Sequence, residues 1–501
     1  MGWKQTRGLE RFVPHRRVRQ AFLMALGGIY FIAFTSLGRQ VLGLHGARGI
    51  RPVRDVVDAP RWAVVGRRRW LEVPSLFWWG ASDRALLGGT RVGQALALAV
   101  MAGVLPQPAL AALWALYLSY VSVGREFLSF QWDALLLEMG LLAALTAPAG
   151  WRPGPGRWEP SAWEVAAWRV LLFRLYLGSG LSKLQSGDPT WRQLTACDFY
   201  FETAPLPTRV GWLAHQTPPR LRRFSTASVL VLETLVPLLV LAPRRARFAG
   251  FGLLSALQAL IFLTGNYGFF NVQSAVLGLW LLDDEALRRV WPATPRARPR
   301  PVWRTVGGAV AVAPLLALGA NELLARLPRP PTPPRWLDVV DTWTRPLRAV
   351  NSYGLFAVMT VRRPEITLEG SLDGHTWHPY TFRYKVDAVD EAPARVAPYQ
   401  PRLDWQMWFA ALGSPPGWLL ALVVRLLEGS PEVEALFAQT PFGPRPPRYV
   451  RGVLHEYRMT DRETRRRTGA WWTRERVGLY LPPMELAPPG GERRLRRYVQ
   501  A

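Results

Sequence analysis

Nine apolar runs fill most of the first two-thirds of this chain, and they constrain its fold more than any other feature. They lie near residues 21–37, 92–105, 109–123, 127–147, 163–182, 226–242, 248–264, 271–282 and 305–324. A helix needs about 20 apolar residues to cross the roughly 30 Å hydrocarbon core of a bilayer, and several runs approach that length. We therefore predict a helical membrane domain over residues 1–326, with about seven to nine spans. The pair flanking Pro106-Gln107-Pro108 fits two spans, one kinked span or a re-entrant hairpin.

The charge distribution predicts how these spans are oriented. The chain carries 62 Lys and Arg against 36 Asp and Glu, a formal net charge of +26. Basic residues gather at the N-terminus and in residues 243–247 and 283–304. Cytoplasmic loops favour Lys and Arg, so we place the N-terminus, 106–108, 148–162, 243–247 and 283–304 in the cytoplasm. The loops 38–90 and 183–225, and everything after Leu324, then lie outside.

The same charge also fits nucleic-acid binding, because clustered cations release counterions from phosphate. The basic residues lie beside apolar spans, however, which favours anionic lipid headgroups as their partner. We therefore predict a lipid bilayer and no nucleic acid as partner. Only three of the 62 basic residues are lysines, an Arg bias typical of GC-rich genomes, which favours a bacterial inner membrane.

A Pro-rich stretch at 327–334 reads as a stiff linker to a strand-rich part at 335–485. Apolar and polar residues alternate there around Asp373-Gly374, which is typical of a β-hairpin. Further predicted elements are strands at 449–459 and 470–481, short helices at 405–412, 417–427 and 432–439, and a basic tail at 486–501. The predicted fold class is a polytopic α-helical membrane bundle followed by an extracytoplasmic β-rich, β-sandwich-like soluble domain.

Charged residues within or beside the apolar runs are candidates for chemistry: Asp133, Glu138, Lys183 and Asp188. A charge at membrane depth is costly and marks either a structural pair or a functional site. The structural interpretation pairs Asp133 with Arg125 or Arg174, and Lys183 with Asp188. The functional interpretation makes Lys183 a base, because burial lowers the pKa of a lysine, with the carboxylates as its partners.

Aromatic and polar residues of the outer loops and outer domain form a second candidate set. The loop from Trp191 to Pro219 is too polar for lipid and rich in Pro and aromatics, so it suits contacts with headgroups or an unfolded client. The client-binding candidates are Trp191, Tyr200, Glu202, His215, Asn266, Asn271, Asn351, Tyr353, Arg402, Asp404, Trp405 and Gln406. The single cysteine, Cys197, excludes an intrachain disulfide. His375 and His378 have no obvious third ligand, so we predict no metal and no cofactor.

Several strings of residues together resemble the lipase maturation factor family. The matching segments are Phe127–Glu138, Gly178–Leu194, Asn266–Asn271, Asn351–Thr360, Glu369–Gly374 and Pro401–Leu412. The resemblance implies a polytopic membrane protein that helps secreted lipases to fold and assemble; the animal members lie in the endoplasmic reticulum membrane. A shorter segment, Tyr176–Trp191, is similar to the lysine-bearing segment of vitamin K-dependent carboxylase-like membrane proteins, which implies that Lys183 is a base.

Two functions follow from these observations. The first is a membrane-anchored folding or maturation factor for exported proteins, with lipase-like hydrolases as clients by resemblance. The alternative is a membrane-embedded enzyme, carboxylase-like or lipid-modifying, that uses Lys183 as base with Asp or Glu partners. Whether the chain is an enzyme is left open, with the first function preferred.

Overall fold

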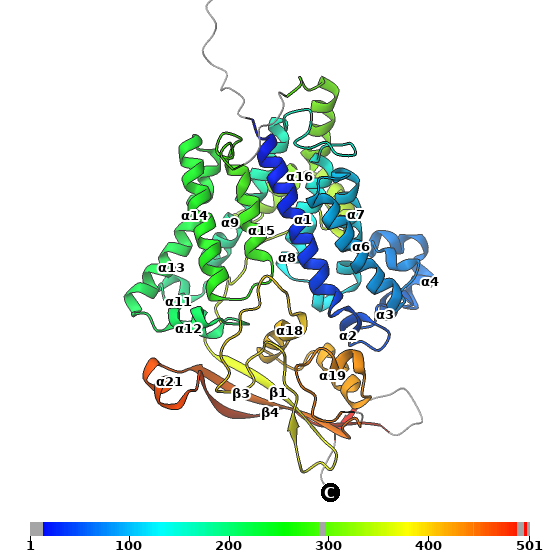
Figure 1. The fold of residues 1–501 in the computed structure, drawn as a ribbon, viewed down its shortest axis with the longest axis vertical. Helices are drawn as coiled ribbons and strands as arrows, with labels where there is room; N and C mark the ends of the chain where they lie inside the picture. Colours follow the sequence, from blue (N-terminus) through cyan, green and yellow to red (C-terminus); the bar gives the residue numbers. More distant parts are fainter. Residues whose placement is uncertain (1–13, 291–296, 444, 488–494, 498–501) are drawn as a thin grey trace, which may run out of the picture.

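Long helices stand side by side in the upper part of the molecule, and a twisted sheet with short helices lies below them (Figure 1). This computed structural model describes residues 14–290, 297–443, 445–487 and 495–497. Helix α1 (Arg16–Gly38) runs through the centre of the bundle with Val18, Phe22 and Leu26 fully buried. The end of the bundle at which α1 begins points away from the sheet.

Each of the nine apolar runs lies mainly in a helix. The helices are α1, α6 (Asp83–Met101), α7 (Pro106–Val123), α8 (Gln131–Thr146), α9 (Ala162–Gln185), α13 (Pro219–Thr234) continued by η4 (Val236–Leu241), α14 (Arg244–Thr264), α15 (Phe270–Gly278) continued by η5 (Leu279–Leu281), and α16 (Val302–Leu324). Four of them are long and apolar enough to cross a membrane: α1, α13 with η4, α14 and α16. A multi-pass membrane protein is therefore confirmed, whereas the count of seven to nine spans stays a prediction.

The segment around Pro106 separates two distinct helices. Residues 102–105 leave the helical path between α6 and α7, and Leu105, just before α7, has a left-handed φ of 44°. Pro106 and Pro108 begin α7 because proline fits the first turn of a helix, where no N–H is required. The alternative of one kinked helix is thus wrong.

The segments predicted to be cytoplasmic meet at one end of the bundle. The N–H of His15 donates to Glu159 (3.1 Å), Arg300 pairs with Glu164 (2.8 Å), and Arg244 pairs with Asp283. The N–H of Leu105 donates to the carbonyl of Trp151 (2.8 Å), which brings the 106–108 turn to the same end. The opposite end carries the predicted outer loops and faces the sheet (Figure 1).

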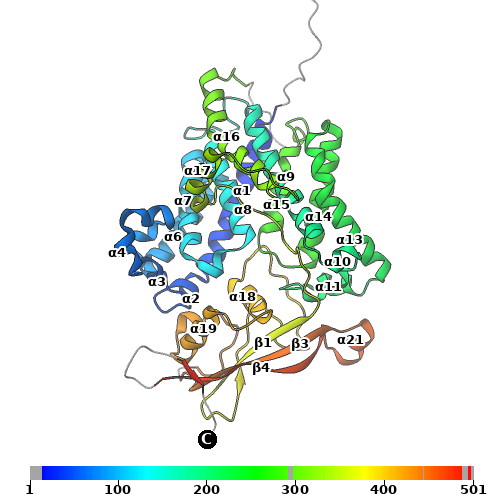
Figure 2. The same cartoon turned by 180° about the vertical axis from the view of Figure 1, so that it is seen from behind.

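The outer loops are built from short helices. Residues 38–90 contain α2 (Val41–His45), α3 (Arg54–Val57), α4 (Arg61–Val65), η1 (Gly66–Arg68), α5 (Arg69–Glu72) and η2 (Leu76–Trp78). η3 (Arg125–Leu128) precedes α8, and residues 183–218 contain α10 (Pro189–Arg192), α11 (Ala196–Thr203) and α12 (Arg209–His215). After α16, helix α17 (Arg335–Thr344) lies against the bundle beside α16 and is followed by η6 (Arg345–Leu347) (Figure 2).

The lower part contains one antiparallel sheet in the order β2-β1-β3-β4-β5. Its strands are β1 (Arg363–Ser371), β2 (His378–Pro379), β3 (Tyr449–Met459), β4 (Trp472–Leu486) and β5 (Leu495–Arg497). The β1–β2 hairpin turns at Gly374 with φ of 80°, as the Asp-Gly signal predicts. Among the described residues, a second facing sheet is not present, so the sandwich-like architecture is not confirmed.

Helices take the place of that second sheet. Leu403 and Met407 of α18 (Arg402–Ala411) and Leu419 and Leu422 of α19 (Gly417–Leu427) share a core with Ile366 of β1. The helix predicted at 432–439 is only the short α20 (Pro431–Glu434), and α21 (Arg462–Thr468) joins β3 to β4. Within the predicted basic tail, residues 495–497 form β5 and pair with β4. Residues 488–494 and 498–501 of that tail, and the basic residues up to position 13, lie outside the described residues.

Apolar packing continues from the bundle into the sheet domain. Leu44, Ile50 and Phe127, from the bundle side, pack in the core of the sheet domain. Conversely, Tyr353 and Trp405 are buried in the core of the bundle. Since each part completes the core of the other, the boundary between them is a packed joint.

Candidate functional site

A buried ion pair lies at the centre of the joint. Asp133, in the first turn of α8, accepts from both terminal nitrogens of Arg402, the first residue of α18, at 2.8 and 2.9 Å. The hydroxyl of Tyr117 also donates to Asp133 (2.5 Å), and Arg402 donates to the carbonyl of Phe127 (2.6 Å). A planar guanidinium matches a carboxylate with two parallel bonds, so the pair fixes both distance and angle between α8 and α18.

A second buried pair ties the segment before β1 to the bundle. Glu138, one turn and a half further along α8, accepts from Arg174 of α9 (2.5 Å). The hydroxyl of Tyr353 and the backbone N–H of Asn351 donate to the other oxygen of Glu138, at 2.7 and 3.0 Å. Arg174 in turn donates to the carbonyl of Asn351 (2.6 Å). Residues 351–353 are therefore held across α8 and α9.

Asn266, between α14 and α15, forms a third connection. Its side-chain oxygen accepts from the N–H groups of Val396 and Ala397, at 2.8 and 2.9 Å, and its amide donates to the carbonyl of Ala394 (2.8 Å). The backbone carbonyl of Asn266 accepts from the indole of Trp405 (3.2 Å). The side chain of this asparagine thus holds three residues of the segment 394–397 in the sheet domain. It contacts only their backbone groups, which any residue type offers.

The outer loop at 189–216 is hydrogen-bonded to β1 and to the end of β3. The side chain of Glu202 accepts from the N–H of Met459 (2.8 Å), and its carbonyl accepts from Arg363 of β1 (2.7 Å). His215 lies 3.6 Å from Glu202; burial lowers the pKa of this histidine, and the Glu202 charge acts in the opposite direction. Trp212 donates to the carbonyl of Thr460 (3.0 Å). Fully buried Arg363 was not among the predicted residues, because a basic residue at a strand start reads as solvated.

α18 packs its polar residues inward as well as its apolar ones. Gln406 donates to the carbonyl of Glu126 (2.5 Å), and Asp404 accepts from the backbone N–H groups of Tyr384 (2.8 Å) and Lys385 (3.0 Å). Burial raises the pKa of Asp404 to about 6, although the two N–H groups oppose the rise.

We expect Asp404 to make the stability of the protein depend on pH. A carboxyl whose pKa rises from 3.8 to about 6 on folding stabilises the fold when protonated, and this contribution is lost as the pH rises through 6. Between pH 5 and 7.5, the wild type should therefore lose about 1.4 kcal/mol relative to Asp404→Asn, whose side chain does not titrate. Thermal unfolding of both proteins in detergent at the two pH values measures this difference. Parallel pH profiles would contradict the assignment.

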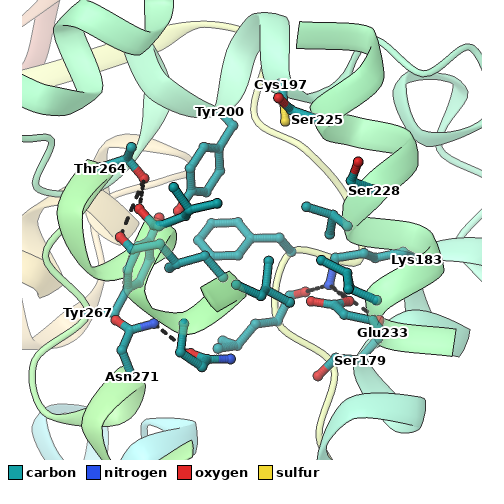
Figure 3. Close-up of a pocket in the computed structure, with 18 of the residues that line it drawn as sticks. Ser179, Lys183, Cys197, Tyr200, Ser225, Ser228, Glu233, Thr264, Tyr267 and Asn271 are labelled. Atoms are coloured by element: carbon teal, nitrogen blue, oxygen red, sulfur yellow. Dashed lines mark hydrogen bonds and ion pairs between the residues drawn. The ribbon is translucent and has the colours of Figure 1, made fainter. Parts of the chain in front are cut away.

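Lys183 and Glu233 form a separate buried pair on the other side of α9. The ammonium of Lys183 donates to Glu233 of α13 (2.6 Å; Figure 3). It also donates to the carbonyl of Leu355 (3.0 Å). The indole of Trp191 covers it, with the ring centre 5.4 Å from the nitrogen, and itself donates to the carbonyl of Phe356 (3.0 Å). These contacts make Lys183 a bound cation that holds residues 355–356 against the bundle.

Asp133 and Lys183 are therefore paired, as predicted, but with other residues than the predicted ones. Asp133 pairs with Arg402, not with Arg125 or Arg174, and Lys183 pairs with Glu233. Asp188 instead accepts from the N–H of Thr190 at the start of α10 and from the N–H of Met359 (2.5 Å). Glu233 was missed, although a lone carboxylate inside the apolar run 226–242 was a usable signal.

Most of the client-binding candidates lie inside the joint. Arg402, Asp404, Trp405, Asn266 and Tyr353 are all at most 3% exposed. Trp191, Asn271 and Gln406 are also buried, and Tyr200 stacks on Tyr267 with ring centres 6.3 Å apart. Asn351, Glu202 and His215 are partly buried. In this conformation they bind other parts of the chain, so a client would reach the buried ones only if the joint opened.

The fold and the joint define a class of protein: a multi-pass membrane protein whose helical bundle carries a docked sheet domain. The profile of the lipase maturation factor transmembrane domain matches residues 17–289, and that of the lipase maturation factor C-terminal domain matches residues 349–482. The chain belongs to the lipase maturation factor family.

Relatives cover nearly the whole chain. Lipase maturation factor 2 from Homo sapiens is 34% identical over 612 aligned residues, covering 96% of this chain and 85% of that protein. Lipase maturation factor 1 from Bos taurus is 33% identical over 506 aligned residues, covering 93% of this chain and 88% of that protein. No solved structure matches this chain. The carboxylase-like alternative receives no support from these comparisons.

Proposed function

We propose that this protein is a membrane-anchored maturation factor that helps exported lipase-like hydrolases to reach their active fold. Membership of the lipase maturation factor family carries this proposal, because both domains match in order and the named relatives align over most of their length. The packed joint supports it, since the sheet domain is held at a defined position beside the membrane, where an emerging client would meet it. The clients are proposed from the names of the relatives.

We further propose that the chain divides as its composition suggests, into a membrane domain at 1–326, a linker at 327–334, an outer domain at 335–485 and a basic tail at 486–501. The limits of the two matched profiles, 17–289 and 349–482, support this division. A departure is the segment 349–360, which packs on the bundle although it follows the linker; Tyr353 and Met359 show this by their bonds to Glu138 and Asp188.

The proposed function predicts a gain in the specific activity of a client. An exported lipase from the same genome, expressed in a bacterial host with and without this protein, should show several-fold more activity per amount of secreted lipase when the protein is present. A folding factor changes the fraction of active molecules, so lipase antigen alone is not a sufficient measurement. An exported phosphatase serves as the control and should not change. Equal specific lipase activity in both strains would overturn the proposal.

We propose that the sheet domain lies outside the cytoplasm of a bacterial inner membrane, with the N-terminus inside. The basic segments at the opposite end of the bundle support this orientation. Helix α17 exposes Trp336, Val339 and Trp343 on one face, each more than half exposed, as suits a helix at a membrane interface.

Cysteine labelling tests this orientation. In a Cys197→Ser background, Leu372→Cys lies on the exposed hairpin of the sheet domain and Arg245→Cys on the opposite end of the bundle. A membrane-impermeant maleimide added to spheroplasts should label the first variant at once and the second only after lysis. The reverse pattern would place the sheet domain in the cytoplasm.

A further inference from the structure

A cavity of about 380 Å³ lies among α9, α11, α13, α14 and α15, close to the joint (Figure 3). Its walls are mainly apolar, with Leu175, Leu232, Leu257, Ile261 and Phe270 among the lining residues. The volume falls within the roughly 300–1,000 Å³ of small-molecule pockets.

The cavity opens between two membrane-spanning helices. Leu221 and Phe224 of α13 and Leu260 of α14 line it and are 48%, 69% and 61% exposed. Both helices belong to candidate spans whose apolar surface is mostly not covered by the rest of the protein, 28% of one window and 22% of the other being buried. In a bilayer these side chains face hydrocarbon. An occupant therefore enters sideways from the membrane.

Buried polar atoms line the inner wall. The side-chain oxygen of Asn271 is buried and accepts no hydrogen bond from the described residues, while the nearby hydroxyls of Tyr200 and Tyr267 are buried and interact mainly with each other. Figure 3 shows the three side chains spread along the side of the cavity opposite Lys183. Leaving a buried acceptor without a donor is costly, so the free oxygen of Asn271 beside two tyrosine hydroxyls indicates a ligand that completes its bonds.

The charge of the cavity restricts that ligand. Lys183 and Glu233 both line it, but they neutralise each other at 2.6 Å. No net charge is left to bind an ionic headgroup. Asn271 offers an acceptor and the tyrosines offer donors, and a single hydroxyl group on the ligand both donates and accepts.

We propose that this cavity binds a neutral membrane lipid with a free hydroxyl group, of the diacylglycerol type. Its hydrocarbon chain lies among the leucines, and its hydroxyl donates to Asn271 and accepts from Tyr200 or Tyr267. This site does not involve a client, so the lipid proposal can be tested separately from the proposed function.

Photolabelling of the full chain tests the site. The protein is reconstituted in phosphatidylcholine vesicles that contain a diacylglycerol with a diazirine in one acyl chain, irradiated, and digested for peptide mapping. Labelled peptides should include residues 197–201, 225–233 and 257–271, and excess unlabelled diacylglycerol should remove the label. When the diazirine is carried by phosphatidylcholine instead, these peptides should show no label that excess unlabelled diacylglycerol removes. Label spread evenly over exposed helices, or equal labelling by both probes, overturns the proposal.

Two variants and a matched control sharpen the result. Ser228→Trp on α13 fills the cavity and should reduce the competed label to background. Val231→Trp, on the same helix but 48% exposed and outside the cavity, introduces the same indole side chain and should label like the wild type. Tyr267→Phe removes only a hydroxyl and should raise the diacylglycerol concentration for half-competition about fivefold. If Ser228→Trp does not fold, the two probes on the wild-type chain decide alone; unchanged labelling in a folded Ser228→Trp overturns the site.

Discussion

Arg402→Met should lower the free energy of unfolding by about 3–5 kcal/mol, the largest effect that we expect from a single substitution in the joint. The change leaves the Asp133 carboxyl group buried without its cation, with Tyr117 as its remaining side-chain partner among the described residues. It also removes the donor to the carbonyl of Phe127. The loss corresponds to a fall of about 10 °C in the thermal midpoint, measured in detergent. Protease should also cut the segment 349–362 faster, because the sheet domain then separates from the bundle.

The companion substitutions separate a lost ion pair from lost packing. The double variant Asp133→Leu, Arg402→Met removes both charges and should recover most of the loss, since apolar residues of similar volume replace buried ion pairs well. Arg476→Met, on the exposed part of β4, should change the free energy by less than about 0.5 kcal/mol. A midpoint for Arg402→Met equal to that of Arg476→Met would show that the pair does not hold the joint.

Lys183→Met should have the second-largest effect, again about 3–5 kcal/mol, because it leaves Glu233 as a buried carboxylate without its cation. The carbonyl of Leu355 loses its donor as well, so residues 355–356 should loosen from the bundle. Thermal unfolding in detergent measures the first effect. Hydrogen exchange of the 353–360 amides, which should become faster, measures the second.

Further substitutions distinguish a structural lysine from a catalytic one. Lys183→Met combined with Glu233→Gln should recover part of the lost stability, because the uncompensated charge is gone. Lys183→Arg keeps the positive charge, although its larger guanidinium group must fit beside Trp191. The specific activity of the client should stay within about a factor of two of the wild-type value, and the free energy of unfolding should change little. A fully stable Lys183→Arg that has lost all client activation would contradict our assignment and revive a chemical role for the lysine.

The positions of the helices followed from local patterns. All nine apolar runs form helices, because a run near 20 residues can cross or fill a bundle only as a helix that satisfies its own backbone bonds. The Asp373-Gly374 turn was predicted for the same kind of reason, since its geometry depends on two neighbouring residues. The segregation of Arg likewise predicted which segments share an end of the bundle.

Only the tertiary structure decided which residues the buried charged side chains pair with. Asp133 and Arg402 lie 269 positions apart, and Lys183 and Glu233 lie 50 apart. No periodicity relates such positions, because a side chain meets its partner only after helices and loops have docked. The same reason explains why residues predicted to meet a client are buried: Trp405 and Asn266 look like exposed polar and aromatic residues until α18 packs on the bundle. Sequence determined which segments form apolar helices and which family the chain resembles; long-range packing decided what its charged residues do.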